Sequence, residues 1–460
     1  MPYRSVRLAL LQEPYHGEAA RIFAVSGRVG EDWGSGRAPW PRRQDQATPG
    51  ACQRARREIL FPHRSGSCTE DGVNRRRGAR VTVNAIPNGN LQTVRPIQGD
   101  LEGRYVLLDG LRGVAAFAII LDHIPSGPIG ALFPGRYLGV QFFFVLSGFV
   151  MAHAYGRRLA AGMSVWALMR VRLIRLYPLY LLGFAIALAV NLYYVFKGWR
   201  DFSPLQLGVW TALGALMLPS PLARSGALYP LNGPSWTLFF ELVANFIYGL
   251  TARRLTGRVF AIILPISGAV MAWTCFEHPL EVGPWQWACF DMGLSGVIYD
   301  FFMGVLIYRL NAKWRLPALP AGLAFVAFAA VIMAPLQGVW RQGWDALAAV
   351  LLMPLIVAAF ANSKVDGRLG KACAIFGMLS YGIYILHVPL AGAMAPVIQK
   401  FTGAPPQGVI WYFAVAAVAA ATVAIAQDSY DRPMRKLLAR LWTPKLSPRA
   451  ATPDQERAPP

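Results

Sequence analysis

The sequence predicts an all-α polytopic membrane protein with about ten transmembrane helices and one re-entrant or interfacial segment. Hydrophobic residues make up 55% of the chain, and they gather in long runs instead of the amphipathic stripes of soluble helices. The net charge of +21 reflects 45 Lys and Arg against 24 Asp and Glu. After the first hundred residues, these basic side chains stand in short clusters between apolar runs. This positive-inside pattern indicates a lipid bilayer as the partner, and no nucleic acid.

Residues 1–100 differ from the rest of the chain in composition. They contain 16 Arg, no Lys and nine acidic residues, with no apolar stretch long enough for a core or a spanning helix. We expect a disordered, arginine-rich leader here; the alternative is a mis-assigned start, with translation beginning just before Leu101. The transmembrane domain is then expected over 101–435, followed by a cytoplasmic basic and proline-rich tail over 436–460.

Eleven apolar runs follow the leader, and the charge of the loops predicts how many of them cross. The runs are 106–122, 137–155, 177–196, 205–219, 235–252, 258–275, 291–309, 317–335, 345–361, 376–397 and 408–427. Clustered arginines mark the loops 156–176 and 252–258 as cytoplasmic, yet three runs lie between them. Because two loops on one side need an even number of crossings, one run does not cross. The shortest, 205–219, is flanked by prolines, so we predict that it is re-entrant and that both termini are cytoplasmic.

The first predicted span carries Asp109, Arg112 and His123 within or at the edge of its apolar run. Each such group at bilayer depth costs roughly 2.5 kcal/mol or more, so several in one span predict a functional site. Arg112 and His123 share nearly the same helix face and lie about 16 Å apart along it. His123 is the candidate general base, and Asp109 is the expected partner of Arg112. The alternatives are a hydrogen-bonded histidine at a helix end and a purely structural ion pair.

Five ordered motifs resemble those of the acyltransferase 3 family of bacterial inner-membrane O-acyltransferases. They are Leu-Asp-Gly-Leu-Arg-Gly at 108–113 with His123, Gly-Val-Gln-Phe-Phe-Phe-Val-Leu-Ser-Gly-Phe at 139–149, Arg-Leu-Ile-Arg-Leu-Tyr-Pro at 172–178, Pro-Ser-Trp-Thr-Leu-Phe-Phe-Glu at 234–241 and Ser-Tyr-Gly-Ile-Tyr-Ile-Leu-His at 380–387. The resemblance covers about residues 105–435. Two positions depart from the family pattern: Gln141 stands where many members have Asp, and Asp431 stands where Glu is usual.

The resemblance implies an activity as well as a fold. Members move an acyl group from cytoplasmic acyl-CoA to a hydroxyl group, so we expect transfer of an acyl group, acetyl above all, to a glycan, a glycolipid or a secondary metabolite. The family's Arg-x10-His motif falls on Arg112 and His123, and its Arg-x-x-Arg motif falls on Arg172 and Arg175. The latter pair is expected to hold phosphates of coenzyme A. Alternatively, these arginines set topology and bind anionic lipid.

Two later spans supply the expected substrate-binding residues. Trp236 and Glu241 lie in the run 235–252, where Glu241 should pair with a cation of another span, Arg112 being one candidate, or be neutral. Tyr384 and His387 lie in the run 376–397 and would line an acceptor pocket or satisfy one another. The five cysteines show no paired metal spacing, so we expect no metal ion.

A rival interpretation is a secondary transporter in which Asp109, Arg112, His123 and Glu241 form a path for protons or substrate. An inverted repeat would favour it. The Asp-Gly-Leu-Arg-Gly motif at 109–113 has no counterpart near residue 290, in the second half of the chain.

Overall fold

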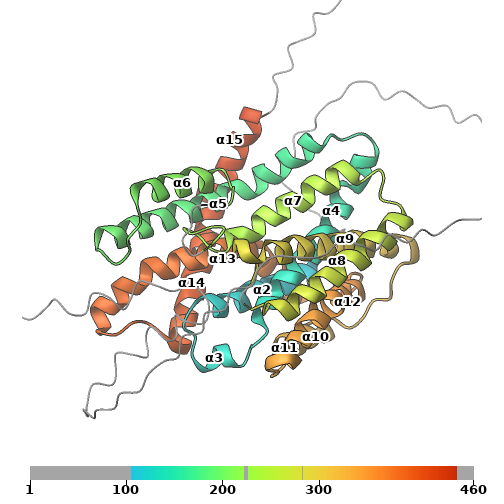
Figure 1. Cartoon of the computed structure of the whole chain (residues 1–460). Coiled ribbons are helices and arrows are strands. Elements are labelled where there is room, and N and C mark those ends of the chain that lie inside the picture. The colour runs from blue at the N-terminus through green and yellow to red at the C-terminus, as the bar shows by residue number, and fades with distance from the viewer. Residues whose placement is uncertain (1–104, 222–225, 282, 443–460) are drawn as a thin grey trace, which may run out of the picture. The chain divides into compact units, whose positions relative to one another are not determined.

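The computed structural model describes residues 105–221, 226–281 and 283–442, and the predictions for the leader and for residues beyond 442 fall outside them. In these ranges the chain is helical, with one isolated β-bridge between Ala227 and Gln286 (Figure 1). The helices are α2 (Val106–His123), α3 (Pro128–Ala131), α4 (Gly139–Ala160), α5 (Val165–Phe196), α6 (Pro204–Ala215), α7 (Ser235–Thr251), α8 (Gly257–Glu277), α9 (Phe290–Trp314), α10 (Ala321–Ile332), α11 (Gly338–Leu347), α12 (Met353–Phe360), α13 (Gly367–Thr402), α14 (Gly408–Ala426) and α15 (Arg432–Trp442). Short 3-10 helices precede α4 and α9, and π-helical turns precede α12 and α15. The expected all-α class is confirmed for this part of the chain.

Seven helical segments in the described ranges are long and apolar enough to cross a bilayer. They are Arg136–Ala160, Val165–Phe196, Gly257–Glu277, Trp287–Trp314, Gly338–Phe360, Gly367–Thr402 and Gly408–Trp442. The count of about ten spans is therefore not confirmed. The other three predicted spans are helices that are too short or too charged to count as candidate spans. Helix α2 contains three charged side chains in 18 residues, α7 has 17 residues and α10 has 12.

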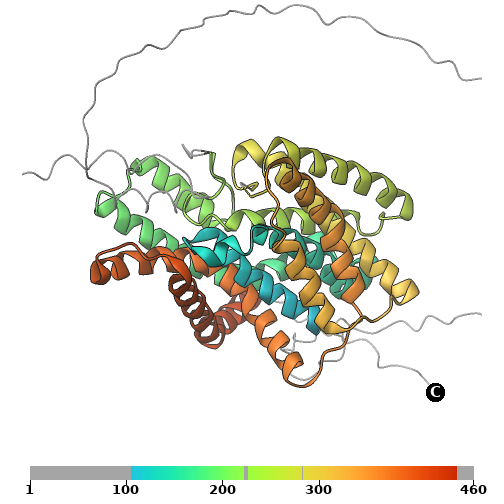
Figure 2. The ribbon, with the colours of Figure 1, turned by 90° about the horizontal axis from the view of Figure 1, so that it is seen from below.

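Helix α2 lies inside the bundle, and its apolar residues face three separate hydrophobic clusters. Leu108 and Leu111 join one cluster, Ile119 a second, and Ile120 and Leu121 a third. A helix with apolar residues on several faces is largely buried in a bundle. This explains why α2, drawn in blue in Figure 2, is surrounded by other helices. Any polar side chain on α2 must therefore find its partners within the protein.

The helices are held at close range by small residues. A Cβ added to Gly148 of α4 would fall inside the van der Waals distance of the Phe301 carbonyl of α9, and one on Gly304 would do the same at the Val145 carbonyl. Such backbone approach is the usual way that membrane helices associate, because lipid gives no hydrophobic drive between them. The two glycines thus lock α4 and α9 together.

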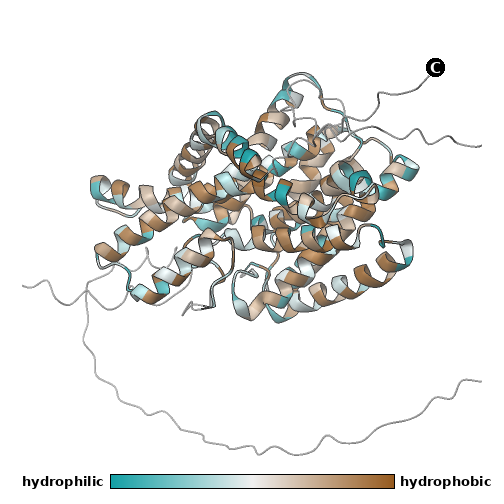
Figure 3. Cartoon of the chain, turned by 90° about the horizontal axis from the view of Figure 1, so that it is seen from above, coloured by the Kyte–Doolittle hydropathy of each residue, from teal (hydrophilic) through white to brown (hydrophobic). Residues whose placement is uncertain are grey.

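The outer surface of the bundle is apolar in places, as expected for contact with lipid. On α8, Ile262, Ile266, Val270 and Trp273 recur at helical spacing and are all exposed, and Figure 3 shows hydrophobic residues along most of the long helices. An exposed apolar stripe of this kind marks a membrane or protein contact.

The predicted re-entrant segment is helix α6 followed by an irregular return. Ser203 caps the helix by accepting from the Gln206 amide, and Met217 turns the chain with a φ of 59°. Tyr177 and Tyr180 of α5 donate to carbonyls at the end of α6. Twelve residues rise about 18 Å, well short of a hydrocarbon core of about 30 Å. That this segment is re-entrant stays a prediction.

Candidate functional site

Helices α2 and α13 run side by side in the same direction and fix Arg112. Gly110 packs on Cys373 and Gly113 on Phe376, so the two backbones are close. Arg112 forms the expected ion pair with Asp109, at 3.1 Å. Its guanidinium also donates to Ser380 Oγ at 2.9 Å and to the Gly377 carbonyl at 2.7 Å. Arg112 is therefore rigidly held by both helices.

Glu241 of α7 pairs with Arg172 of α5, not with Arg112. Arg112 is already held by Asp109 and α13, whereas Arg172 is buried and faces α7. Ser147 of α4 donates a second hydrogen bond to Glu241, at 2.7 Å. Three helices are joined at this carboxylate. That Glu241 binds substrate stays a prediction.

A cavity of about 110 Å³, here called the arginine cavity, brings these groups together. It is lined by Arg112, Arg172, Arg175, Glu241 and Tyr384, with apolar side chains from α4, α5 and α7. Three guanidiniums against one carboxylate give it an excess positive charge. Arg175 forms no ion pair with any residue in the described ranges, which makes its guanidinium the one best placed for an anion.

A series of three rings leads from the arginine cavity to His123. Tyr384 lines that cavity, its ring lies 6.2 Å from the ring of His387, and the His387 ring lies 4.9 Å from that of His123. His387 is fully buried, and its Nε2 has no hydrogen-bond partner in the described structure. Each imidazole has Nδ1 within hydrogen-bond distance of a carbonyl one turn earlier, Ile119 for His123 and Ile383 for His387. If Nδ1–H donates there, Nε2 of each ring is the basic nitrogen.

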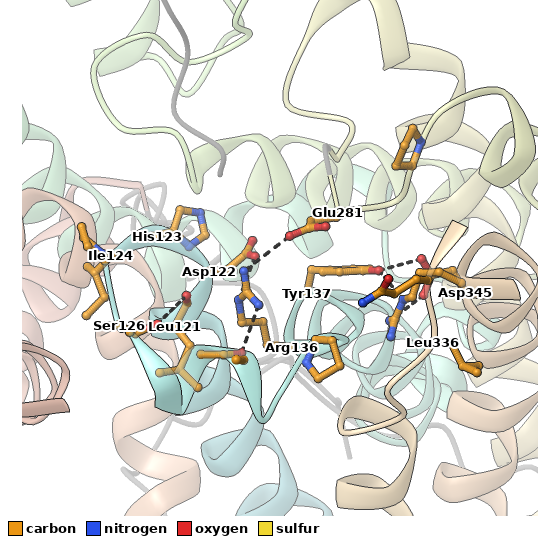
Figure 4. A pocket seen from close by; sticks show the side chains of 18 of the residues that line it. Leu121, Asp122, His123, Ile124, Ser126, Arg136, Tyr137, Glu281, Leu336 and Asp345 are labelled. Carbon is orange, nitrogen blue, oxygen red and sulfur yellow. Dashed lines mark hydrogen bonds and ion pairs between the residues drawn. The ribbon is translucent and has the colours of Figure 1, made fainter. Parts of the chain in front are cut away.

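His123 lines a second cavity, of about 860 Å³, here called the His123 cavity. Arg136 pairs with Asp122 at 3.2 Å and with Glu281 at 3.5 Å. Arg341 pairs with Asp345 at 2.7 Å. Figure 4 shows His123 and Asp122 at one side of this cavity and Asp345 at the other, with Arg136 and Glu281 between them. Burial raises the pKa of Glu281, and the guanidinium of Arg136 partly offsets the rise.

Trp236, an expected substrate-binding residue, lines neither cavity, and neither do the two positions that depart from the family pattern. Trp236 is buried against Phe144 and Phe240. Gln141 is buried, and its Oε1 has no partner in the described structure. Asp431 holds Arg435 through both carboxylate oxygens, at 2.9 and 2.7 Å.

Most residues of the His123 cavity do not stand out in the sequence as site residues. Arg136 and Arg341 lie in segments that the predicted topology places outside the cytoplasm, against the positive-inside trend. Such an exception can indicate a functional residue, because the positive-inside rule does not account for an arginine on that side. Ser380 stands out in the sequence only as the first residue of the motif at 380–387, and nothing in the sequence pairs it with Arg112.

The fold and site define a helical membrane protein with buried arginines and a cavity-lining histidine on one central helix. The profile of a family described as "Acyltransferase domain" matches residues 105–426. The chain belongs to this acyltransferase 3 family and is an acyltransferase, a conclusion that does not favour the transporter interpretation.

The chain is similar to several named proteins, one of which is called an acyltransferase. "Protein 2 in picA locus" of Rhizobium radiobacter is 38% identical over 36% of this chain and 93% of its own length. "Exopolysaccharide production protein ExoZ" of Rhizobium meliloti (strain 1021) is 28% identical, over 54% of this chain and 74% of its own. "Acyltransferase MdmB" of Streptomyces mycarofaciens is 27% identical, over 61% and 77%. No solved structure matches the chain.

Proposed function

We propose that this protein is an O-acyltransferase of the bacterial inner membrane, with several spans and both termini in the cytoplasm. It moves an acyl group, acetyl being the simplest case, from acyl-CoA to a hydroxyl of a glycan, a glycolipid or a secondary metabolite. The observation that carries the proposal is the arrangement on α2: Arg112 lines one cavity and His123 lines another, with the rings of Tyr384 and His387 between them.

The donor is assigned to the arginine cavity by charge. Phosphates of coenzyme A are anionic, and guanidiniums bind them through charge-assisted hydrogen bonds. A cavity of about 110 Å³ is too small for a whole nucleotide. We therefore assign Arg175 to a phosphate near the cavity mouth, with the pantetheine arm extending toward His123. The rise from Arg112 to His123, about 16 Å, is the distance that this arm must help to cover.

The acceptor is assigned to the His123 cavity by chemistry. His123 accepts the proton of the acceptor hydroxyl at Nε2 as the oxygen attacks the thioester carbonyl. The carbon–sulfur bond then breaks, and the coenzyme A thiolate leaves with the proton that the imidazolium returns. The products are the ester and free coenzyme A, so atoms and charge balance.

Substitution of the two histidines tests the base. General-base catalysis typically contributes about 10² to 10⁴ in rate, so His123→Ala should lose most acyl transfer. His123→Gln should be nearly as poor, because an amide does not take a proton at neutral pH. His387→Ala, at a residue that lines neither cavity, should be milder. Acylated product is measured at matched levels of inserted protein. Activity close to wild type in His123→Ala, with loss in His387→Ala, would move the base to α13.

A further inference from the structure

The two arginines of the His123 cavity, Arg136 and Arg341, are both ion-paired with carboxylates of the protein. Arg136 contacts Asp122 through Nε, the carbonyls of Gly130 and Phe133 through Nη1, and Glu281 through Nη2, at 3.2 to 3.5 Å. These partners come from the end of α2, from α3 and the residues that follow it, and from the loop after α8. Nη1 and Nη2 donate hydrogen bonds to their acceptors, whereas Nε faces Asp122 at ion-pair distance without a hydrogen bond in the described structure.

Arg341 is held in the same way. Its Nε donates to the Tyr137 hydroxyl at 2.8 Å, Nη1 to the Ala334 carbonyl at 3.3 Å, and Nη2 contacts Asp345 at 2.7 Å. Tyr137 itself donates to the other oxygen of Asp345, at 2.6 Å. An anionic ligand would have to break one of these two networks before it could bind a guanidinium, and it would leave a buried carboxylate without its partner.

The charge of the cavity is unfavourable for an anion as well. Three carboxylates and two guanidiniums line it: Asp122, Glu281 and Asp345 with Arg136 and Arg341. The side chain of Glu281 is about half exposed, at 52%, so it is the carboxylate most available to a ligand. Like charge in a site of reduced dielectric repels an incoming anion, and uncompensated repulsion of this kind is an effective means of specificity.

The other lining groups fit an uncharged polar ligand. Side chains of Ser126, Gln337, Gln342 and Gln407 line the cavity and offer hydroxyl and amide groups that both donate and accept. A volume of about 860 Å³ lies within the usual range of small-molecule sites. The arginine cavity has the opposite excess charge, so the two cavities differ in the sign of ligand that they favour.

We propose that the His123 cavity selects acceptors that are neutral or cationic around the reacting hydroxyl and rejects anionic ones such as uronic acids and phosphorylated sugars. The inference rests on the proposed function, because it takes this cavity as the acceptor site. It also explains how an enzyme with an anionic donor keeps that donor from occupying the acceptor site.

Binding of three matched sugars tests the proposal without requiring catalysis. The probes are methyl β-glucoside, methyl β-glucosaminide and methyl β-glucuronide, which share one ring and differ in charge. Dissociation constants are measured by calorimetry on the full chain in nanodiscs of neutral lipid, without acyl-CoA. We expect the glucuronide to bind at least tenfold more weakly than the other two.

Charge variants show whether the cavity causes the selectivity. Glu281→Lys turns the excess charge positive and should narrow or reverse the ratio, while Gln342→Glu should widen it. Glu277→Lys is the matched control, because Glu277 is exposed, lies four residues earlier and does not line the cavity. It should leave the ratio unchanged.

The outcomes separate this proposal from the general one. Equal binding of glucoside and glucuronide, an unchanged ratio in both cavity variants, or no binding of any probe would overturn the charge selectivity of the cavity. Acyl transfer is assayed in parallel. Selective binding without any acyl transfer from acyl-CoA would instead contradict the proposed function.

Discussion

Arg172 and Arg175 stand three residues apart in one motif, yet the structure gives them different tasks. Arg172 is buried and paired with Glu241, which also accepts from Ser147. Arg175 lines the arginine cavity and has no ion pair in the described ranges. We predict that Arg172→Gln lowers the stability of the protein. Arg175→Gln should weaken the binding of acyl-CoA without changing stability.

The magnitudes follow from burial. Removing one partner of a buried ion pair costs about 3 to 5 kcal/mol, since the other charge is left without compensation. Arg172→Gln should therefore unfold at a clearly lower temperature, and Arg172→Gln combined with Glu241→Gln should recover part of the loss. A hydrogen bond to a charged group contributes about 1.5 to 3 kcal/mol. Loss of one at Arg175 should raise the KM for acyl-CoA about tenfold to a hundredfold.

The assay combines thermal unfolding in nanodiscs with release of the coenzyme A thiol at varied acyl-CoA. Arg170→Gln is the control, because Arg170 is exposed on the same helix and lines neither cavity. It should change neither quantity. An unchanged donor KM in correctly inserted Arg175→Gln would refute the phosphate assignment and favour a role in topology. Unchanged stability in Arg172→Gln would refute the account of the buried pair.

Three further predictions concern packing, pH and topology. Gly148→Ala should lower the thermal midpoint, because its methyl group would clash with the Phe301 carbonyl and overpacking costs about 1 to 3 kcal/mol; an unaltered midpoint would contradict the close approach of α4 and α9. The raised pKa of Glu281 means that it takes up a proton at a higher pH than an ordinary glutamate. Binding of methyl β-glucosaminide, measured by calorimetry, should therefore weaken as the pH falls through this range, and less so in Glu281→Gln; equal losses would exclude Glu281 as the cause. Cysteines at Ser203 and Ser225 should both react with an impermeant thiol reagent from outside if residues 205–219 are re-entrant, and labelling of only one would reject the predicted topology.

The site was predictable in part. Residues within one segment could be recognised, but contacts between residues far apart in the sequence could not. Ionisable residues in an apolar span are costly, so Asp109, Arg112 and His123 stood out from one segment alone. The partner of Glu241 did not, because Arg172 lies 69 residues away and many side chains could have met that carboxylate. The Ser380 contact of Arg112 spans 268 residues and was out of reach for the same reason.

The sequence by itself determined the helical class, the family motifs and the central importance of α2. The periodicity of apolar residues and the presence of isolated charges in apolar runs are local properties of a chain. Only the tertiary structure decided that Arg172 forms an ion pair with Glu241 and that the ring of His387 lies against that of His123. It also decided that two cavities of opposite excess charge lie on either side of the histidine rings. These facts depend on how far apart helices pack and how they are rotated. Packing distances and rotations arise from many weak contacts summed over the whole bundle, and no single segment carries them.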